Sequence, residues 1–302
     1  MITGTDKKIA IITGATGGIG TQLSKSLIKD GYNVLALCRN SKNGTQNRVA
    51  GVEYITGNLD NYDTVNYFIE SIINTLNGRP IDILFNNAGI IAPSFKLNDN
   101  GIESSLFVNC LAPVIITERL LPYFTPYGGR VVNTLSCTID ERRAKRRVRS
   151  FDFKKLTGNL TNNEDTKRLL TGFKEMTDAI GLNRHEGFVS LINYSITKRL
   201  LALYTSCLFN DYLSGNRSVI ALGADPGVVN TGIITQHRWY DPLADIFFRP
   251  FIKSPEKGSI PLYRAATEAL DEQASVYSNR AGSAVNTLVI FKGKDRVCLK
   301  GL

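Results

Sequence analysis

Three polar side chains in this 302-residue chain have the types and spacing to manage a proton at a carbonyl or alcohol group. Tyr194 carries a phenol with an ordinary pKa of about 10. Lys198 follows four residues later, which places both side chains on one face of a helix. A cation held one helical turn away favours the phenolate and would lower the pKa of the tyrosine. Ser136 could donate a hydrogen bond that fixes a substrate oxygen. Taken singly, a solvated helical pair and a strand-end serine explain these residues equally well.

A glycine-rich turn joins the first expected strand, 9–13, to a helix. The stretch 13–20 has the pattern T-G-x-x-x-G-x-G, with glycines at Gly14, Gly18 and Gly20. Glycine allows the backbone to approach a pyrophosphate, and the helix N-terminus behind the turn offers free N–H groups and a positive dipole end. This context favours a nucleotide site, and a merely flexible turn is the alternative.

The motifs along the chain, taken together and in order, resemble the short-chain dehydrogenase/reductase family. They are TGxxxGIG at 13–20, NNAG at 86–89, an asparagine at 109, a serine at 136, YxxxK at 194–198 and PGxVxT at 226–231. No single motif is specific, but the set spans residues 13 to 231 in the family's order. Local features at 36–40, 109–113 and 151–156 are similar to its retinol-dehydrogenase-like branch. The resemblance implies hydride transfer between a nicotinamide cofactor and a carbonyl or alcohol substrate.

The resemblance also implies a role for each matching residue. Tyr194 would be the general acid and base, Lys198 would lower its pKa and reach the nicotinamide ribose, and Ser136 would orient the carbonyl. Asn109 would hold the water that links Lys198 to solvent. The implied cofactor-binding residues are Gly14, Thr16, Gly17, Gly18, Ile19, Gly20, Arg39, Asn58, Leu59, Asn87, Ala88, Gly89, Tyr194, Lys198, Pro226, Gly227, Val229 and Thr231, the last of which would reach the carboxamide.

The end of the second expected strand bears on the choice of cofactor. Family members that prefer NAD have an acidic residue there, whereas this chain has Cys38 followed by Arg39. An acid would repel a 2′-phosphate and an arginine can pair with it, so the sequence predicts NADP(H) over NAD(H). A surface arginine without a ligand is the alternative. Asn58, before Leu59, stands where the family usually has an aspartate that faces the adenine.

A parallel sheet is needed to position these residues. Apolar, β-branched runs alternate with segments of helical period. Strands are expected at 9–13, 33–38, 52–56, 81–85, 130–135, 218–222 and 288–291, and helices at 18–31, 62–77, 101–124 and 194–214. The alternation predicts an α/β fold, a single Rossmann-like doubly wound parallel sheet with helices on both faces. Residues 1–302 are expected to form one domain.

Two segments interrupt the alternation. Residues 139–190 are polar and charged and form an insertion that is too long for an ordinary loop. Its part within 157–190 is expected to form a helical lid or an oligomer contact beside the mouth of the active site. Residues 232–272 are expected to cover the substrate. The aromatic residues of this cover either line an apolar pocket or pack it onto the body; they are Trp239, Tyr240, Phe247, Phe248 and Phe251. Ser254 and Pro255 look like the start of a helix.

The chain is basic, with 36 lysines and arginines against 27 acidic residues and a formal net charge of +9. Anionic partners are therefore favoured. Part of the excess lies in a basic run at 142–149: Arg142, Arg143, Lys145, Arg146, Arg147 and Arg149. The run is either a solvated loop or a site for an anionic group on a substrate or a surface. Nucleic acid is not expected as a partner, because the signatures of the common binding motifs and interleaved stacking aromatics are missing.

Other protein classes are disfavoured by composition. Five dispersed cysteines and two distant histidines predict neither a disulfide framework nor a metal site. No signal-peptide-like or long apolar stretch is found, so we expect a cytoplasmic protein without a transmembrane segment. We expect a small apolar carbonyl or alcohol as substrate, steroid-, retinoid- or aromatic-like, and a homo-oligomer is compatible with the sequence. The alternative is a non-catalytic protein that senses NADP(H), although a sensor does not need Ser136, Tyr194 and Lys198 together.

Overall fold

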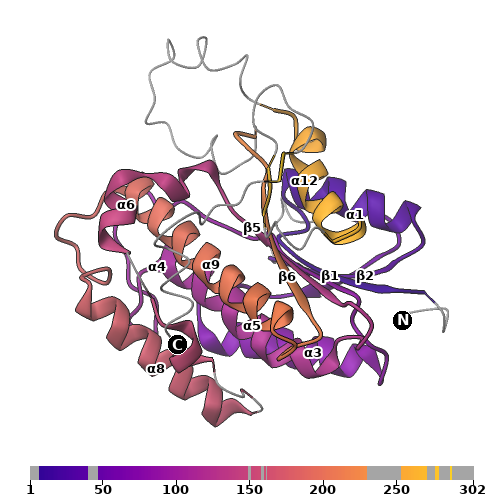
Figure 1. Cartoon of the computed structure of the whole chain (residues 1–302), viewed down its shortest axis with the longest axis horizontal. Coiled ribbons are helices and arrows are strands. Elements are labelled where there is room, and N and C mark those ends of the chain that lie inside the picture. Colours follow the sequence, from indigo (N-terminus) through magenta and orange to yellow (C-terminus); the bar gives the residue numbers. More distant parts are fainter. Residues whose placement is uncertain are drawn as a thin grey trace.

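The computed structural model describes residues 7–39, 47–148, 151–157, 160, 162–229, 253–270, 276–278 and 286–287. An eight-stranded sheet lies at its centre, in the order β3-β2-β1-β4-β5-β6-β7-β8 (Figure 1). The strands are β1 (Ile9–Thr13), β2 (Asn33–Cys38), β3 (Val52–Thr56), β4 (Ile83–Asn86), β5 (Arg130–Thr134), β6 (Ile220–Asp225), β7 (Val276–Ser278) and β8 (Asn286–Thr287). Neighbouring strands run parallel from β3 to β7, and only β8 is antiparallel. The predicted Rossmann-like α/β class is confirmed.

Helices cover both faces of the sheet, because the strands are apolar on both sides. Along β1, Ile9 and Ile11 enter one hydrophobic cluster while Ala10 and Ile12 enter another, as the period of two requires. Figure 1 shows α1 and α12 together on one side of the sheet and α3, α5 and α9 on the other. These helices are α1 (Gly18–Lys29), α3 (Tyr62–Leu76), α5 (Ala112–Leu120), α9 (Ser190–Leu213) and α12 (Pro255–Thr267).

The predicted strand bounds hold best for continuous apolar runs. The bounds of β1, β2 and β3 are as predicted, and β5 ends one residue earlier. The strand expected at 218–222 is observed as β6 at 220–225. The prediction ended too early because the second half of the strand, Gly223-Ala224-Asp225, lacks the β-branched residues that are typical of strands. Likewise, β4 starts at Ile83 and ends at the polar Asn86. The strand expected at 288–291 lies outside the described residues.

The helix expected at 101–124 is interrupted at its centre. It consists of α4 (Ser104–Leu106), a π-helical turn η1 (Phe107–Leu111), α5 and a short 3₁₀ turn η2 (Leu121–Tyr123). Among the described helices, the run Ser104–Tyr123 is the one long and apolar enough to cross a membrane, and 89% of that window is buried inside the fold. It therefore packs as a core helix beneath the sheet.

The described part of the insertion forms three helices, which the sequence did not delimit. They are α6 (Arg142–Arg147), α7 (Phe153–Leu156) and α8 (Asn163–Ala179). The Phe153 ring lies 5.3 Å from the ring of Tyr204 on α9, and Phe151 lies 5.5 Å from Phe173 on α8. In addition, Arg119 of α5 donates to Asn163 at 2.8 Å. The insertion thus packs along the outer side of α5 and α9, and only its first part, α6, follows directly on the predicted Ser136.

We predict that Phe153→Ala lowers the free energy of unfolding by about 3–5 kcal/mol, because it empties a large buried site between α7 and α9. Phe153 is only 2% exposed. Urea unfolding followed by circular dichroism measures the change. Tyr127→Ala, at a residue that is 91% exposed, is the control and should change stability by less than about 0.5 kcal/mol. Equal effects of the two substitutions would show that α7 does not stabilise the body.

Candidate active site

The carboxyl ends of the parallel strands bring the predicted residues to one edge of the sheet. The glycine-rich turn follows β1, Asn87 to Gly89 follow β4, and Ser136 lies just beyond β5. Pro226 follows β6 at the same edge, and α9 carries Tyr194 and Lys198 toward it. This is the edge at which open α/β sheets bind their ligands.

The glycine-rich turn is shaped as a cradle in which Gly14 and Gly20 have no room for a side chain. Gly14 has a φ of +68°, and a Cβ on Gly20 would lie 2.3 Å from the carbonyl oxygen of Gly14. The N-cap of α1 is Gly17, and no side chain caps this helix end or places an acid in its first turn. The free N–H groups and the helix dipole are therefore left for an anion, which fits the pyrophosphate of a dinucleotide.

Asn87 holds the cradle in place. Its side-chain amide donates to the carbonyl oxygens of Thr13 and Gly14 at 3.1 and 3.2 Å, and its backbone N–H donates to the Thr13 hydroxyl at 3.0 Å. The N–H of Ala88 donates to the same hydroxyl at 3.1 Å. A Cβ on Gly14 would lie 2.9 Å from the Cα of Ala88, so the two turns touch. In this structure Asn87 and Ala88 serve as positioning residues for the turn.

A second arginine lies near the predicted Arg39 and was missed by the sequence reasoning. Arg39 is exposed at the end of β2. Arg48 donates to the sulfur of Cys38 at 3.4 Å, and its guanidinium lies 4.9 Å from the ring centroid of Tyr54. The neighbouring Asn47 donates to the carbonyl oxygen of Thr16 at 3.3 Å, which ties this segment to the cradle. The return of the chain just before β3 brings Arg48 here, and no local motif marks it.

Several other predicted cofactor residues are engaged within the protein. The side-chain oxygen of Asn58 accepts from the N–H of Leu59 at 2.8 Å, and the Leu59 side chain is buried in the core. Val229 packs on α12, where a Cβ on Gly258 would lie 2.6 Å from its Cγ2. Gly227 has a φ of +74° after Pro226, as a tight turn requires. Thr231, and the aromatic residues from Trp239 to Phe251, lie outside the described residues.

Tyr194 and Ser136 meet, as predicted. A side-chain hydrogen bond with Ser136 favours the phenolate of Tyr194, but burial has the larger effect and raises the pKa of Tyr194 well above its ordinary value. The carboxylate of Asp225, at the end of β6, raises this pKa further. The Tyr194 hydroxyl therefore keeps its proton at neutral pH.

Lys198 is a buried cation held by a backbone carbonyl. It is 2% exposed, and its Nζ donates to the carbonyl oxygen of Thr134 at 2.7 Å. Burial lowers the pKa of Lys198 to about 8, since it penalises the charged ammonium. Nζ lies 5.7 Å from the ring centroid of Tyr194. Burial has the largest effect on the pKa of Tyr194, and Nζ is bonded to Thr134, so the expectation that Lys198 lowers this pKa stays a prediction.

Asn109 lies in the π-helical turn and is fully buried. Its Nδ2 donates to the carbonyl oxygen of Ile90 at 2.8 Å and to the Thr197 hydroxyl at 3.1 Å, and its Oδ1 accepts from the N–H of Ile90 at 2.8 Å. A Cβ on Gly89 would lie 3.4 Å from Oδ1 and 3.5 Å from Nζ of Lys198. Asn109 and Lys198 therefore converge on the backbone of Gly89.

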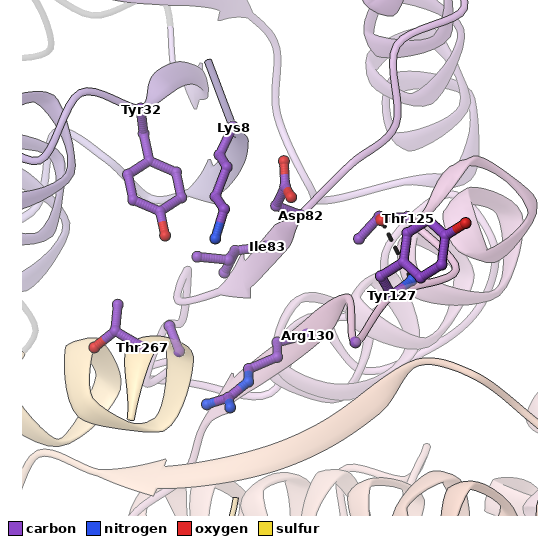
Figure 2. Close-up of a pocket in the computed structure, with 10 residues that line it drawn as sticks. Lys8, Tyr32, Asp82, Ile83, Thr125, Tyr127, Arg130 and Thr267 are labelled. Atoms are coloured by element: carbon purple, nitrogen blue, oxygen red, sulfur yellow. Dashed lines mark hydrogen bonds between the residues drawn. The ribbon is translucent and has the colours of Figure 1, made fainter. Parts of the chain in front are cut away.

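A cavity of about 190 Å³ lies away from this group (Figure 2). It is lined by Lys8, Tyr32, Asp82, Ile83, Thr125, Tyr127, Gly128, Arg130, Ala266 and Thr267. Its residues precede or begin β1, β2, β4 and β5, so it opens at the amino ends of the strands. It takes no part in the site at the carboxyl ends. Among the described residues, no group of three or more His, Cys, Asp or Glu side chains could hold a metal ion.

Comparisons with known proteins agree with this architecture. A family model described as short chain dehydrogenase matches residues 8–150. The WW domain-containing oxidoreductase of Gallus gallus is 28% identical over 284 residues, which cover 90% of this chain and 61% of that protein. The polyprenol dehydrogenase of Mus musculus is 27% identical over 275 residues, covering 87% and 73%. The chain spans about three fifths of the length of the first curated relatives it matches.

Solved structures show the same fold. A 3-ketoacyl-(acyl-carrier-protein) reductase from Brucella melitensis, complexed with NADH, has a TM-score of 0.59 at 16% identity and covers 90% of this chain and 96% of its own. A short chain dehydrogenase from Burkholderia cenocepacia, in complex with NADP, has a TM-score of 0.58 at 20% identity and covers 86% and 90%.

The lowered pKa of Lys198 predicts a specific pH dependence of stability. Below pH 8 the lysine is charged whether the chain is folded or unfolded, but between 8 and 10.5 the folded chain has released the proton that the unfolded chain still binds. Stability therefore rises with pH in this range. Relative to Lys198→Met, the wild type should gain about 2 kcal/mol in free energy of unfolding between about pH 7 and pH 9.5.

Urea unfolding of both proteins at the two pH values measures this difference. Lys25→Met, on the exposed surface of α1, is the control and should follow the wild type at both pH values. If Lys198→Met also follows the wild type, the ammonium does not carry the burial cost inferred above.

Proposed function

Since the chain belongs to the short-chain dehydrogenase/reductase family, we propose that it is an NADP(H)-dependent oxidoreductase acting on a carbonyl or alcohol substrate. The observation that carries the proposal is the convergence of Ser136, Tyr194 and Lys198 at the edge of the sheet that also holds the glycine cradle. A sensor of the cofactor needs the cradle but not this convergence. We further propose that residues 1–302 act as one domain in the cytoplasm.

The cradle and the two arginines would bind different parts of the cofactor. Gly14, Gly20 and the start of α1 would hold the pyrophosphate through backbone N–H groups. Arg39 and Arg48 would pair with a 2′-phosphate, which supports NADP(H) over NAD(H). When bound, the nicotinamide supplies or accepts the hydride. The remaining steps belong to the side chains of the protein.

Reduction of a carbonyl requires a proton at its oxygen, and Tyr194 supplies it. Its hydroxyl is protonated at neutral pH and hydrogen-bonded with Ser136. Ser136 orients the substrate oxygen through its own O–H and so fixes the direction of proton transfer. Lys198, with a pKa of about 8, exchanges protons close to physiological pH and would return a proton to the tyrosine after each transfer. Asn109 positions this group by linking Ile90 to Thr197.

We propose an apolar substrate, as for the retinol-dehydrogenase-like branch. Apolar side chains are partly exposed near Tyr194: Val189 and Leu191 on either side of the first residue of α9, and Val228 beyond β6. Phe95 and Phe188 pack edge to face on the same side of the site, with centroids 5.8 Å apart. The mouse relative named polyprenol dehydrogenase has a long apolar alcohol in its name, which supports this substrate class.

Substitution of Tyr194 tests the proposed chemistry. Tyr194→Phe should lower the rate of NADPH oxidation with an accepted carbonyl by about 100-fold or more, the usual contribution of a general acid. A panel of apolar carbonyls, followed by the absorbance of NADPH, measures the rate, and the Kd for NADPH should not change. Tyr67→Phe, at an exposed position of α3, is the matched control. A Phe variant as fast as the wild type would refute the mechanism, and a wild type that binds NADPH but reduces nothing would favour a sensor.

The choice of cofactor is tested by binding. Arg39→Gln and Arg48→Gln should each raise the Kd for NADPH by about 10-fold, the effect of one lost charge-assisted hydrogen bond, and leave the Kd for NADH nearly unchanged. Fluorescence titration measures both constants. Lys29→Gln, in the last turn of α1, is the control for a general loss of charge. Wild-type binding of NADH as tight as that of NADPH would contradict the assignment.

A further inference from the structure

We propose that the exposed face of α6 and the start of α9 form a docking surface for an anionic lipid bilayer. This docking surface consists of Arg142, Arg143, Arg146, Arg147, Val189 and Leu191. Binding to the bilayer follows from these residues alone. Its purpose, to present an apolar substrate dissolved in the membrane to Tyr194, rests on the proposed function.

The short helix α6 separates charged and apolar residues cleanly. Ala144 and Val148 are fully buried, while every basic residue of α6 is exposed. Lys145 is paired with Asp140 at 2.8 Å. Arg142, Arg143, Arg146 and Arg147 form no ion pair with another described residue. The acid that begins the helix, Glu141, uses its carboxylate to cap the N–H of Ala144 at 2.7 Å, so it offsets this charge only in part.

The C-terminal end of α6 is tied to α9 and to the segment that precedes it. The side chain of Arg199 on α9 donates to the carbonyl oxygen of Val148 at 2.8 Å, in the buried contact between the two helices. At the other side, the guanidinium of Arg147 lies 3.2 Å from the position a Cβ would take on Gly187. Gly187 precedes α9 by three residues. Arg147 therefore adjoins the segment that leads into α9.

That segment adds apolar residues to the positive face. Val189 and Leu191 are 44% and 41% exposed, on either side of Ser190. The hydroxyl of Ser190 donates to the carbonyl oxygen of Ala92, which anchors the segment to the loop after β4. Leu191 lies less than one helical turn before Tyr194. Exposed apolar side chains beside the active site would thus face whatever the arginines bind.

An anionic bilayer would bind both the arginines and the apolar side chains of the docking surface. Anionic headgroups attract arginines, and apolar side chains gain free energy by entering the boundary between headgroups and acyl chains. A free phosphate in water would leave Val189 and Leu191 exposed. A nucleic acid would stack on aromatic side chains, which α6 does not carry. The combination of charge and apolar exposure therefore favours lipid.

Vesicle binding by the full chain tests the proposal. The wild type should sediment with vesicles of phosphatidylcholine and phosphatidylglycerol, should not sediment with phosphatidylcholine alone, and should be released by high salt. Replacement of all four arginines by glutamine should weaken binding by about 100-fold or more, since each charge near the surface contributes about fivefold. Val189→Ser with Leu191→Ser should weaken binding at low salt, where the wild type is bound, because the apolar side chains no longer enter the bilayer.

The matched control removes the same charge elsewhere. Replacing Lys7, Lys8, Lys25 and Lys29 by glutamine also lowers the formal net charge from +9 to +5, but on exposed residues near β1 and α1. It should retain most of the binding. Equal losses in both quadruple variants, or no binding by the wild type, would overturn the docking surface. So would binding of polyuridine that depends on the four arginines while binding of vesicles does not.

The docking surface and the proposed oxidoreductase function are tested by independent measurements. Vesicle binding is measured without cofactor or substrate, and turnover is measured on a water-soluble carbonyl without vesicles. If docking is absent, turnover of the soluble carbonyl by the wild type is unaffected. If turnover is absent, the comparison of the two quadruple variants still decides the docking surface.

Discussion

The burial of a single ammonium group imposes the strictest demand on this structure. Lys198 must remain out of water, yet transfer of a cation from water into the interior is costly unless it is well paired. Here its described hydrogen-bond partner is a backbone carbonyl, that of Thr134 at the end of β5. The lysine can be held there only because β5 ends at the same edge as the cradle and because α9 packs firmly on the sheet.

The surrounding contacts show how the remaining residues are held around this cation. Asn109 joins the loop after β4 to Thr197 of α9, which is the residue before Lys198. Asn87, in that same loop, binds the turn after β1. Gly89 lies between them with no side chain. The cradle and the helix that carries Tyr194 and Lys198 are thus linked through one short loop, so the two halves of the site cannot move independently by much.

Sequence reasoning succeeded where a local pattern determines the structure. Runs rich in apolar and β-branched residues gave the correct bounds of β1, β2 and β3, and the strand-to-helix glycines gave the cradle. It failed where distant segments meet. Arg48 approaches Cys38 only because the chain folds back before β3, and the raised pKa of Tyr194 depends on its burial. Helix α8 was not delimited because Leu169 and Phe173 are the only apolar residues among its buried positions, in an otherwise polar segment.

The geometry at Asn109 depends on the number of residues in the π-helical turn as well as on their types. A π turn contains one residue more than an α-helical turn, so it rotates the side chains that follow by about 100° relative to those that precede it. Loss of one residue from Phe107–Leu111 would leave a more regular helix, with every other amino acid of the site still present. Such a chain would keep its motifs intact in any comparison by residue identity. It would nevertheless turn Asn109 away from Ile90 or from Thr197, and so separate the elements that this amide joins.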